Sequence, residues 1–116
     1  MLMVTAHAAV AATRDSSAML LLATRSGCLT CHSIDAPAPS ATATKPIGPP
    51  WREVAIKYRG QPGAVDKLTA TVMMGSSPYA SHWKGKVTGL AMPPNAVAID
   101  EVRARKLVRW ILSLAH

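Results

Sequence analysis

The sequence predicts an all-α domain, and three observations support this prediction. Apolar residues recur three or four positions apart in four segments, the spacing that places side chains on one face of a helix. No segment alternates apolar and polar residues as a half-buried strand does. The chain has 116 residues, nearly half of them apolar, which is enough for one small domain but not for two.

The first expected helix covers residues 17–26. Its residues 19–22, Met-Leu-Leu-Leu, are all apolar and form a broad face for packing. Asp15 and Ser16 are candidate N-caps because their side-chain oxygens accept hydrogen bonds from the free amides of a first turn. Gly27 follows and ends the helix.

Three more helices are expected after residues 35–50, a loop rich in Ala, Pro, Ser and Thr. Two of them, at 51–58 and 64–74, are separated by a turn that contains glycine. The last begins at its N-cap, Asp100, and carries a buried stripe of Leu107, Val108, Ile111, Leu114 and Ala115. Four helices with long loops bury little apolar surface alone, so we expect them to surround a large bound group.

The N-terminal residues have features of a secretory leader. Residues 1–12 are apolar and rich in alanine, and 6–8 and 9–11 each have the small-x-small pattern of a signal-peptidase site. We therefore expect 1–14 to be the tail of a signal peptide or a disordered N-terminus, and 15–116 to be the folded domain. No apolar run reaches the ~18 residues of a transmembrane helix, so we expect a soluble periplasmic protein.

The motif that carries the chemistry is Cys28-Leu29-Thr30-Cys31-His32, a C-x-x-C-H sequence. This spacing allows two thioether bonds to haem and supplies an imidazole to the iron. The chain has two cysteines, both in this motif, which excludes an intrachain four-cysteine zinc site. A redox disulfide between them is the alternative, but such a site needs a βαβ context that the sequence lacks.

A second iron ligand is expected at Met92, in the sequence Met-Pro-Pro-Asn. The two prolines fix the backbone and keep the loop from forming helix. His32 and Met92 would give the iron nitrogen on one face and sulfur on the other. His82, Met73 and Met74 are rival second ligands, although the two methionines also follow the apolar spacing of a helix.

The chain resembles the small bacterial class I monohaem cytochromes c over about residues 16–115. The order of features is the same: an N-terminal helix, C-x-x-C-H, a Gly-Pro segment, a helix, Met-Pro-Pro-Asn and a C-terminal helix. The resemblance implies the class I cytochrome c fold, with four or so helices around one covalent haem c. It also implies that Cys28 and Cys31 attach the haem and that His32 and Met92 ligate its iron.

Two further haem contacts are implied by the resemblance. Gly48-Pro49 would brace the proximal ligand, with the Pro49 carbonyl accepting a hydrogen bond from the imidazole of His32. Trp83 would lie near a haem propionate.

The chain also departs from the family pattern. Residues 35–47 form a longer segment than the compact members have, and extra residues separate Trp83 from Met92. The family's arginine of the middle helix is Thr71 here, and its aromatic residue five positions before the first cysteine is Ala23. The longer segment favours a specialised partner protein. Because Thr71 stands where the family has arginine, the haem propionates would pair with other side chains.

These features predict a one-electron carrier and not an enzyme. Its haem c would cycle between ferric and ferrous iron with its two ligands unchanged, and methionine sulfur would give it a positive potential. In a narrower version the chain is the electron-accepting cytochrome subunit of a periplasmic dehydrogenase. The alternative from another class is a haem-based ligand sensor or small haem enzyme with an open distal site.

The formal net charge of +7 predicts an acidic partner. The partner would be a redox protein, such as a dehydrogenase, a reductase or a terminal oxidase with an acidic docking patch. Lys45, Lys84 and Lys86 are candidates for the docking surface if they surround the haem edge. A basic surface also suits nucleic acid, but the haem motif favours redox proteins instead.

Overall fold

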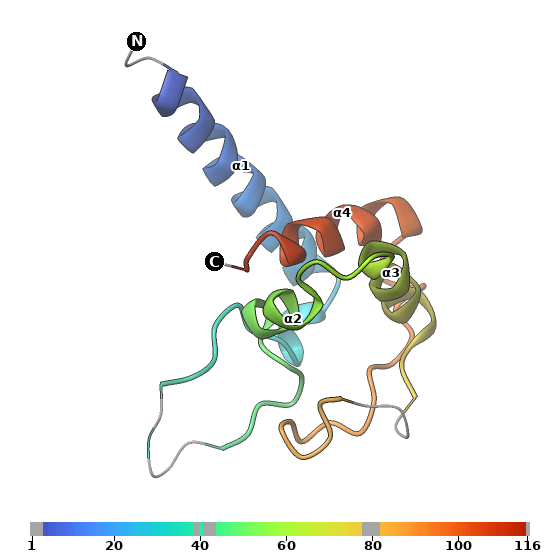
Figure 1. The fold of residues 1–116 in the computed structure, drawn as a ribbon. Helices are drawn as coiled ribbons and strands as arrows, with labels where there is room; N and C mark the ends of the chain where they lie inside the picture. The colour runs from blue at the N-terminus through green and yellow to red at the C-terminus, as the bar shows by residue number, and fades with distance from the viewer. Residues whose placement is uncertain (1–3, 39, 41–43, 78–81, 116) are drawn as a thin grey trace.

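The computed structural model describes residues 4–38, 40, 44–77 and 82–115. Four α-helices follow one another along the chain, with one short 3-10 helix between the first two: α1 (Val4–Arg25), η1 (Cys28–Thr30), α2 (Trp51–Tyr58), α3 (Ala64–Met74) and α4 (Glu101–Leu112). Over the described residues there is no strand, and the single β-bridge joins Lys84 to Val87. The expected all-α class is confirmed (Figure 1).

Helix α1 starts earlier than expected. It runs without a break from Val4 through Asp15 to Arg25, so the prediction of a helix that begins at residue 17 with Asp15 or Ser16 as its N-cap is wrong. The physical reason is the alanine-rich sequence before Asp15, which contains neither glycine nor proline and favours helix. Gly27, with φ of 79°, stops the chain from continuing as helix, as expected.

Helices α2 and α3 have the bounds that the sequence predicts. Pro50 precedes α2 as its N-cap, and Gly63 precedes α3 with φ of 76°. Gly75 ends α3 with φ of 85°, a conformation that costs glycine nothing and is strained for other residues.

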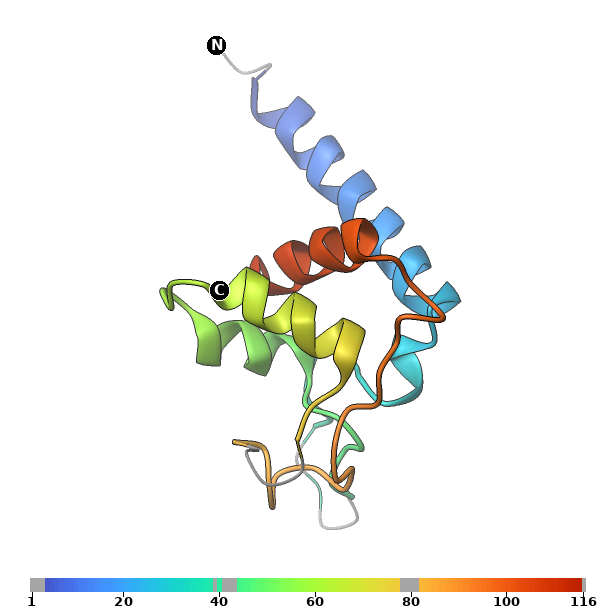
Figure 2. The same ribbon diagram turned by 90° about the vertical axis from the view of Figure 1, so that its right-hand side faces the viewer.

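Helix α4 lies at the centre of the fold and contacts α1, α2 and α3 (Figure 2). The buried core lies around it and consists of Ala23, Trp51, Val54, Ala55, Val72, Ile99, Ala104, Leu107, Val108, Trp110, Ile111 and Leu114. Trp110 packs edge-on against Trp51, with ring centroids 6.0 Å apart, and its Nε1 donates a hydrogen bond of 3.2 Å to Ser16 Oγ. The N-terminal part of α1 projects beyond this core, and the long loops lie at the other end of the molecule (Figure 1).

The long loops are held by backbone hydrogen bonds. The amides of Trp51 and Arg52 donate to the carbonyls of Ser33 and Ile34, at 2.8 and 2.9 Å. Further along, Thr88 and Gly89 donate to Pro46 and Ile47, at 2.8 and 2.9 Å. The segment before residue 50 and the segment after Trp83 are therefore paired with one another, and their relative position is fixed.

The N-cap of α4 leads to a first prediction. Asp100 accepts a hydrogen bond from the amide of Arg103 at 2.8 Å and also pairs with the Arg103 guanidinium. The hydrogen bond from the Arg103 amide contributes most to lowering the pKa of the Asp100 carboxyl below its ordinary value, and the hydrogen bond from the Arg103 side chain adds to this effect. Because the folded-state pKa is lowered, the stabilisation is present above the unfolded pKa of about 4 and is lost as pH falls below it.

We expect Asp100→Ala to lower Tm by a few degrees at neutral pH, because the cap and its charge are both lost. Asp100→Asn should lose less, because its side-chain oxygen still accepts from Arg103. Thermal unfolding followed by circular dichroism from neutral to acidic pH checks this. The gap between wild type and Asp100→Asn should close as pH falls below about 4; a gap that stays constant would exclude the charge as its cause.

Candidate haem site

The C-x-x-C-H motif forms a tight turn directly after α1. The amides of Cys31 and His32 both donate to the carbonyl of Cys28, at 3.3 and 3.1 Å. Both cysteines are half-buried free thiols. Burial raises the pKa of the Cys28 thiol, whereas a thioredoxin-like redox cysteine needs a lowered pKa. The turn therefore presents two half-buried thiols and, directly after the second, an imidazole, as a covalent attachment site requires.

The imidazole of His32 is held by one hydrogen bond. Its Nδ1 lies 2.8 Å from the carbonyl oxygen of Pro49. A carbonyl only accepts, so Nδ1 carries the proton and donates. Burial lowers the pKa of His32, and the hydrogen bond to Pro49 opposes this to a smaller extent. The neutral ring then has its unprotonated Nε2 available as a metal ligand.

Gly48 and Trp51 pack against the imidazole. The amide of Gly48 donates to the Cys31 carbonyl at 2.8 Å, and a Cβ at Gly48 would lie 2.9 Å from Cε1 of His32 and 3.1 Å from its Nδ1. The Trp51 ring stacks on the imidazole, with centroids 5.6 Å apart and an angle of 27° between planes. Glycine is required at residue 48 because any side chain there would push the ring of His32.

We expect Gly48→Ala to destabilise the holoprotein by about 1–3 kcal/mol, the usual cost of overpacking. It should also change the absorption spectrum, because the imidazole must shift. Gly89→Ala is the matched control, since its Cβ would come 2.7 Å from the Ile47 carbonyl oxygen and is equally crowded. Denaturant unfolding and visible spectra check both variants. A normal spectrum for Gly48→Ala would show that residue 48 does not position the ring.

Met92 is held at the C-terminal end of α3. The amide of Ser76 donates to the Met92 carbonyl at 2.9 Å, and the Met92 amide donates to Ser76 Oγ at 2.8 Å. Asn95 donates through both its amide and its side chain to the carbonyl of Val72, at 3.0 and 3.1 Å. The Met92 side chain is half-buried and packs against the core. The methionine loop is therefore fixed to α3 on both sides of the two prolines.

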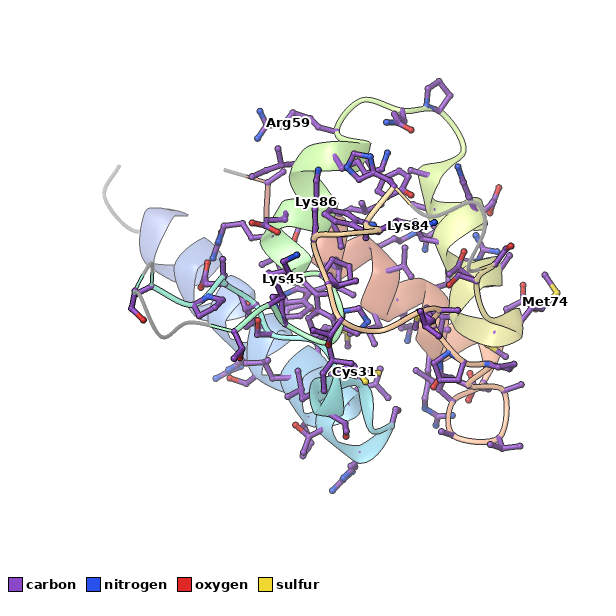
Figure 3. All side chains as sticks on the ribbon, turned by 90° about the horizontal axis from the view of Figure 1, so that it is seen from below. Cys31, Lys45, Arg59, Met74, Lys84 and Lys86 are labelled. Atoms are coloured by element: carbon purple, nitrogen blue, oxygen red, sulfur yellow. The ribbon has the colours of Figure 1, made fainter. Side chains whose placement is uncertain are left out.

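The rival ligands have other surroundings. His82 is exposed. Its Nε2 lies 3.3 Å from Nζ of Lys86, and its ring packs edge-on against Trp83. Met74 is 72% exposed, and Figure 3 shows it pointing outward at the end of α3. Met73 is half-buried against the core.

Trp83, the residue expected near a haem propionate, is half-buried and packs against the core, and Lys86 Nζ lies 5.7 Å from its ring centroid.

Sequence reasoning did not identify three positions that hold the candidate ligands. Trp51 was expected only as part of a helical face, but it also stacks on His32. Ser76 and Gly75 hold the methionine loop, and a Cβ at Gly75 would lie 2.9 Å from the Met92 carbonyl oxygen. Trp51 follows Gly-Pro-Pro directly, which could have indicated its place; Ser76 gives no such signal in the sequence.

Known proteins resemble this chain over most of its length. Cytochrome c-551 of Allochromatium vinosum is 40% identical over 110 residues, which is 94% of this chain and 99% of that protein. The chain belongs to the small class I cytochromes c. Cytochrome c-551 of Pseudomonas aeruginosa is 39% identical over 87 residues, 75% of this chain and 67% of that protein. No family model matches the chain.

Solved structures give the same result for the fold. Nitrosomonas europaea cytochrome c552 has a TM-score of 0.60 and 32% identity, and the match covers 80% of this chain and 95% of that one. The class 1 cytochrome MtoD of Sideroxydans lithotrophicus ES-1 has a TM-score of 0.61 and 29% identity, over 88% and 98% of the two chains. The class I cytochrome c fold expected from the sequence is confirmed.

As a member of this family, the cytochrome is a small electron carrier rather than an enzyme, it acts with redox partners, and the family implies covalently bound haem c. The residues present fit such a group: two free thiols in one turn, an imidazole with a free Nε2 and a thioether held in a fixed loop. None of the helices, over the part of the chain described, is long and apolar enough to cross a membrane.

Proposed function

We propose that this cytochrome carries single electrons on one haem c that is attached through Cys28 and Cys31 and ligated by His32 and Met92. The hydrogen bond between His32 Nδ1 and the Pro49 carbonyl carries this proposal. It fixes the tautomer that leaves Nε2 free to bind iron, and it is the kind of contact that orients a ligating imidazole. The hydrogen bonds of Met92 with Ser76 support the thioether as the second ligand.

The chain's own residues keep the two ligands in place. Bound haem c supplies reversible one-electron chemistry at its iron. Pro49 and Trp51 hold the imidazole ring from two directions, and Ser76 holds the backbone of Met92. Ligands that keep their positions leave little structural rearrangement to slow electron transfer. Thioether ligation favours the reduced state, so we propose a positive reduction potential.

The test is the ferric absorption spectrum of protein matured with a haem-attachment system. Haem that stays with the polypeptide after acid extraction, together with the weak far-red band of methionine–iron ligation, is the expected result. Haem without that band would contradict Met92 as a ligand. Carbon monoxide should not bind the ferrous protein without denaturant; ready binding would overturn the carrier proposal in favour of a sensor or haem enzyme with an open distal site.

We also propose that the protein is exported to the periplasm. The support is the small-x-small pattern within residues 1–14. N-terminal sequencing of the mature holoprotein from a bacterial host should find that these residues have been removed. A mature protein that still begins at Met1 would contradict this proposal.

The proposed docking surface for redox partners consists of Lys45, Lys84 and Lys86. All three are exposed and lie on the two loops that pair through Pro46 and Thr88 (Figure 3). Lys86 also contacts Trp83, the residue that the family resemblance places beside a propionate. Three positive charges on adjoining loops attract an acidic patch and accelerate encounter with it.

We expect Lys84→Gln/Lys86→Gln to slow electron transfer to an acidic redox protein at low salt about tenfold and to flatten its salt dependence. Lys67→Gln/Lys106→Gln removes the same charge from exposed positions on α3 and α4 and should slow the reaction much less. Stopped-flow kinetics over a range of ionic strengths measures both. Equal effects of the two double variants would mean that net charge alone steers the partner.

The partner could also be a periplasmic dehydrogenase that holds this cytochrome as a subunit. The long segment over residues 35–47 supports this narrower version, because it offers a partner-specific surface. Affinity purification of tagged cytochrome tests it. A catalytic subunit that stays bound at high salt supports a stable complex, and release at moderate salt supports a diffusing carrier.

A further inference from the structure

Helices α2, α3 and α4 enclose an open groove of about 720 Å³ that the haem site does not use. Its floor is apolar and contains Ala55, Ala64 and Leu112, and its rim carries Arg59 and Arg109. Figure 3 shows Arg59 at the end of α2, on the other side of the molecule from Cys31. The small alanine side chains leave the hollow between the three helices.

The charges at the rim of the groove are unbalanced. Among the described residues that line the groove, Asp66 carries the one carboxylate. Asp66 pairs with Arg105, which also lies 3.5 Å from Glu101. Within the described residues, Arg59 and Arg109 have no carboxylate at ion-pair distance. The groove therefore combines an apolar floor with two uncompensated guanidinium groups.

We propose that this groove is a second docking site, which binds an acidic segment of a partner polypeptide. An apolar side chain of the segment would enter the hollow between Ala55, Ala64 and Leu112, and its carboxylates would pair with Arg59 and Arg109. Arginine suits this role because its planar group binds carboxylates in a bidentate way. A concave groove favours an inserted peptide over a bilayer, which would contact the rim alone.

The groove and the lysine loops are separate surfaces. The groove is lined by α2, the turn after it, the start of α3, α4 from Arg105 onward and the residues that follow α4. Lys45, Lys84 and Lys86 instead lie on the loops beside Trp83. A partner bound in the groove would leave those loops free for electron exchange. The proposal thus goes beyond the electron-carrier function and does not depend on which residues ligate the iron.

The experiment is an NMR titration of ¹⁵N-labelled ferrous holoprotein with a synthetic peptide of alternating glutamate and leucine. We expect amide shifts at Ala55, Arg59, Gly63 and Arg109 that weaken as salt is raised. Shifts confined to the loop of Lys84 and Lys86, or none at millimolar peptide, would overturn the proposal. Stronger shifts of the groove amides with phosphatidylglycerol vesicles than with the peptide would also overturn it, in favour of a lipid surface.

Two groups of variants separate the groove from general electrostatics. Arg59→Gln/Arg109→Gln should weaken peptide binding about tenfold or more, while Lys45→Gln/Lys84→Gln, with the same charge loss, should change it less than twofold. Ala115→Leu fills part of the groove and keeps every charge, and it should also weaken binding. Unchanged visible spectra and potentials show that the variants fold. Equal loss of binding in the two double variants would overturn the assignment to the groove.

Discussion

Met92→Ala should remove the far-red ferric band and lower the reduction potential. A thioether ligand stabilises ferrous iron, and loss of the proposed ligand would leave the distal side to water or to another side chain. Axial ligands set haem potentials over a range of about 0.8 V, so we expect a fall of roughly a tenth of a volt or more. Covalent haem content should be unchanged, because the proposed attachment through Cys28 and Cys31 does not involve Met92. Absorption spectra and a potentiometric titration measure both effects.

The rival ligands provide matched controls for this experiment. Met73→Ala and Met74→Ala each remove a methionine from the end of α3, and both should keep the far-red band. His82→Ala should also keep it, because the His82 side chain is exposed and lies beside Lys86. Loss of the band in one of these variants, with the band kept in Met92→Ala, would transfer the distal role to that residue.

Trp51→Ala should give the largest loss of stability. Trp51 is 4% exposed, stacks on His32 and meets Trp110 edge-on. Removing a buried tryptophan costs about 3–5 kcal/mol, a large part of the free energy of unfolding of a small domain. The variant should also loosen the imidazole of His32, since one of the contacts that hold its plane is lost. Guanidinium unfolding of the holoprotein, followed by circular dichroism and haem absorbance, measures the loss.

A second substitution separates cavity formation from ring stacking. Trp51→Phe retains an aromatic ring against His32 and should recover more than half of the lost stability. Trp83→Ala is the control for a half-buried tryptophan and should cost less, because Trp83 already has contact with solvent. If Trp51→Ala and Trp83→Ala had equal costs, Trp51 would not be the main link between the core and the site.

The sequence predicted α2, α3 and α4 well because local signals mark their ends. Pro50, Gly63, Gly75 and the N-cap Asp100 lie at helix boundaries, and each acts through its own backbone or side-chain chemistry. Helix α1 begins before its predicted start because the alanine-rich residues ahead of Asp15 favour helix as well as the residues after it do. Asp15 is a good N-cap where the chain has to start a helix, but it also fits inside one.

The candidate site was predicted as a set of residues but not as an arrangement. Motif spacing indicates Cys28, Cys31, His32 and Met92, because covalent attachment and ligation need those residue types. The contacts that hold them depend on tertiary packing. Ser76 meets Met92 because of where α3 ends, and a lone serine in a sequence gives no indication of such a partner.

The hydrogen bonds at both ends of the 35–47 segment determine how evolution or design can alter it. Before the segment, Ser33 and Ile34 accept from the start of α2; after it, Gly48 donates to Cys31. Chain inserted between these anchors does not pull on His32, and doubling the length of a flexible loop costs only about 0.6 kcal/mol. The segment is therefore a tolerant site for insertions, where a recognition sequence can be exchanged without rebuilding the redox centre.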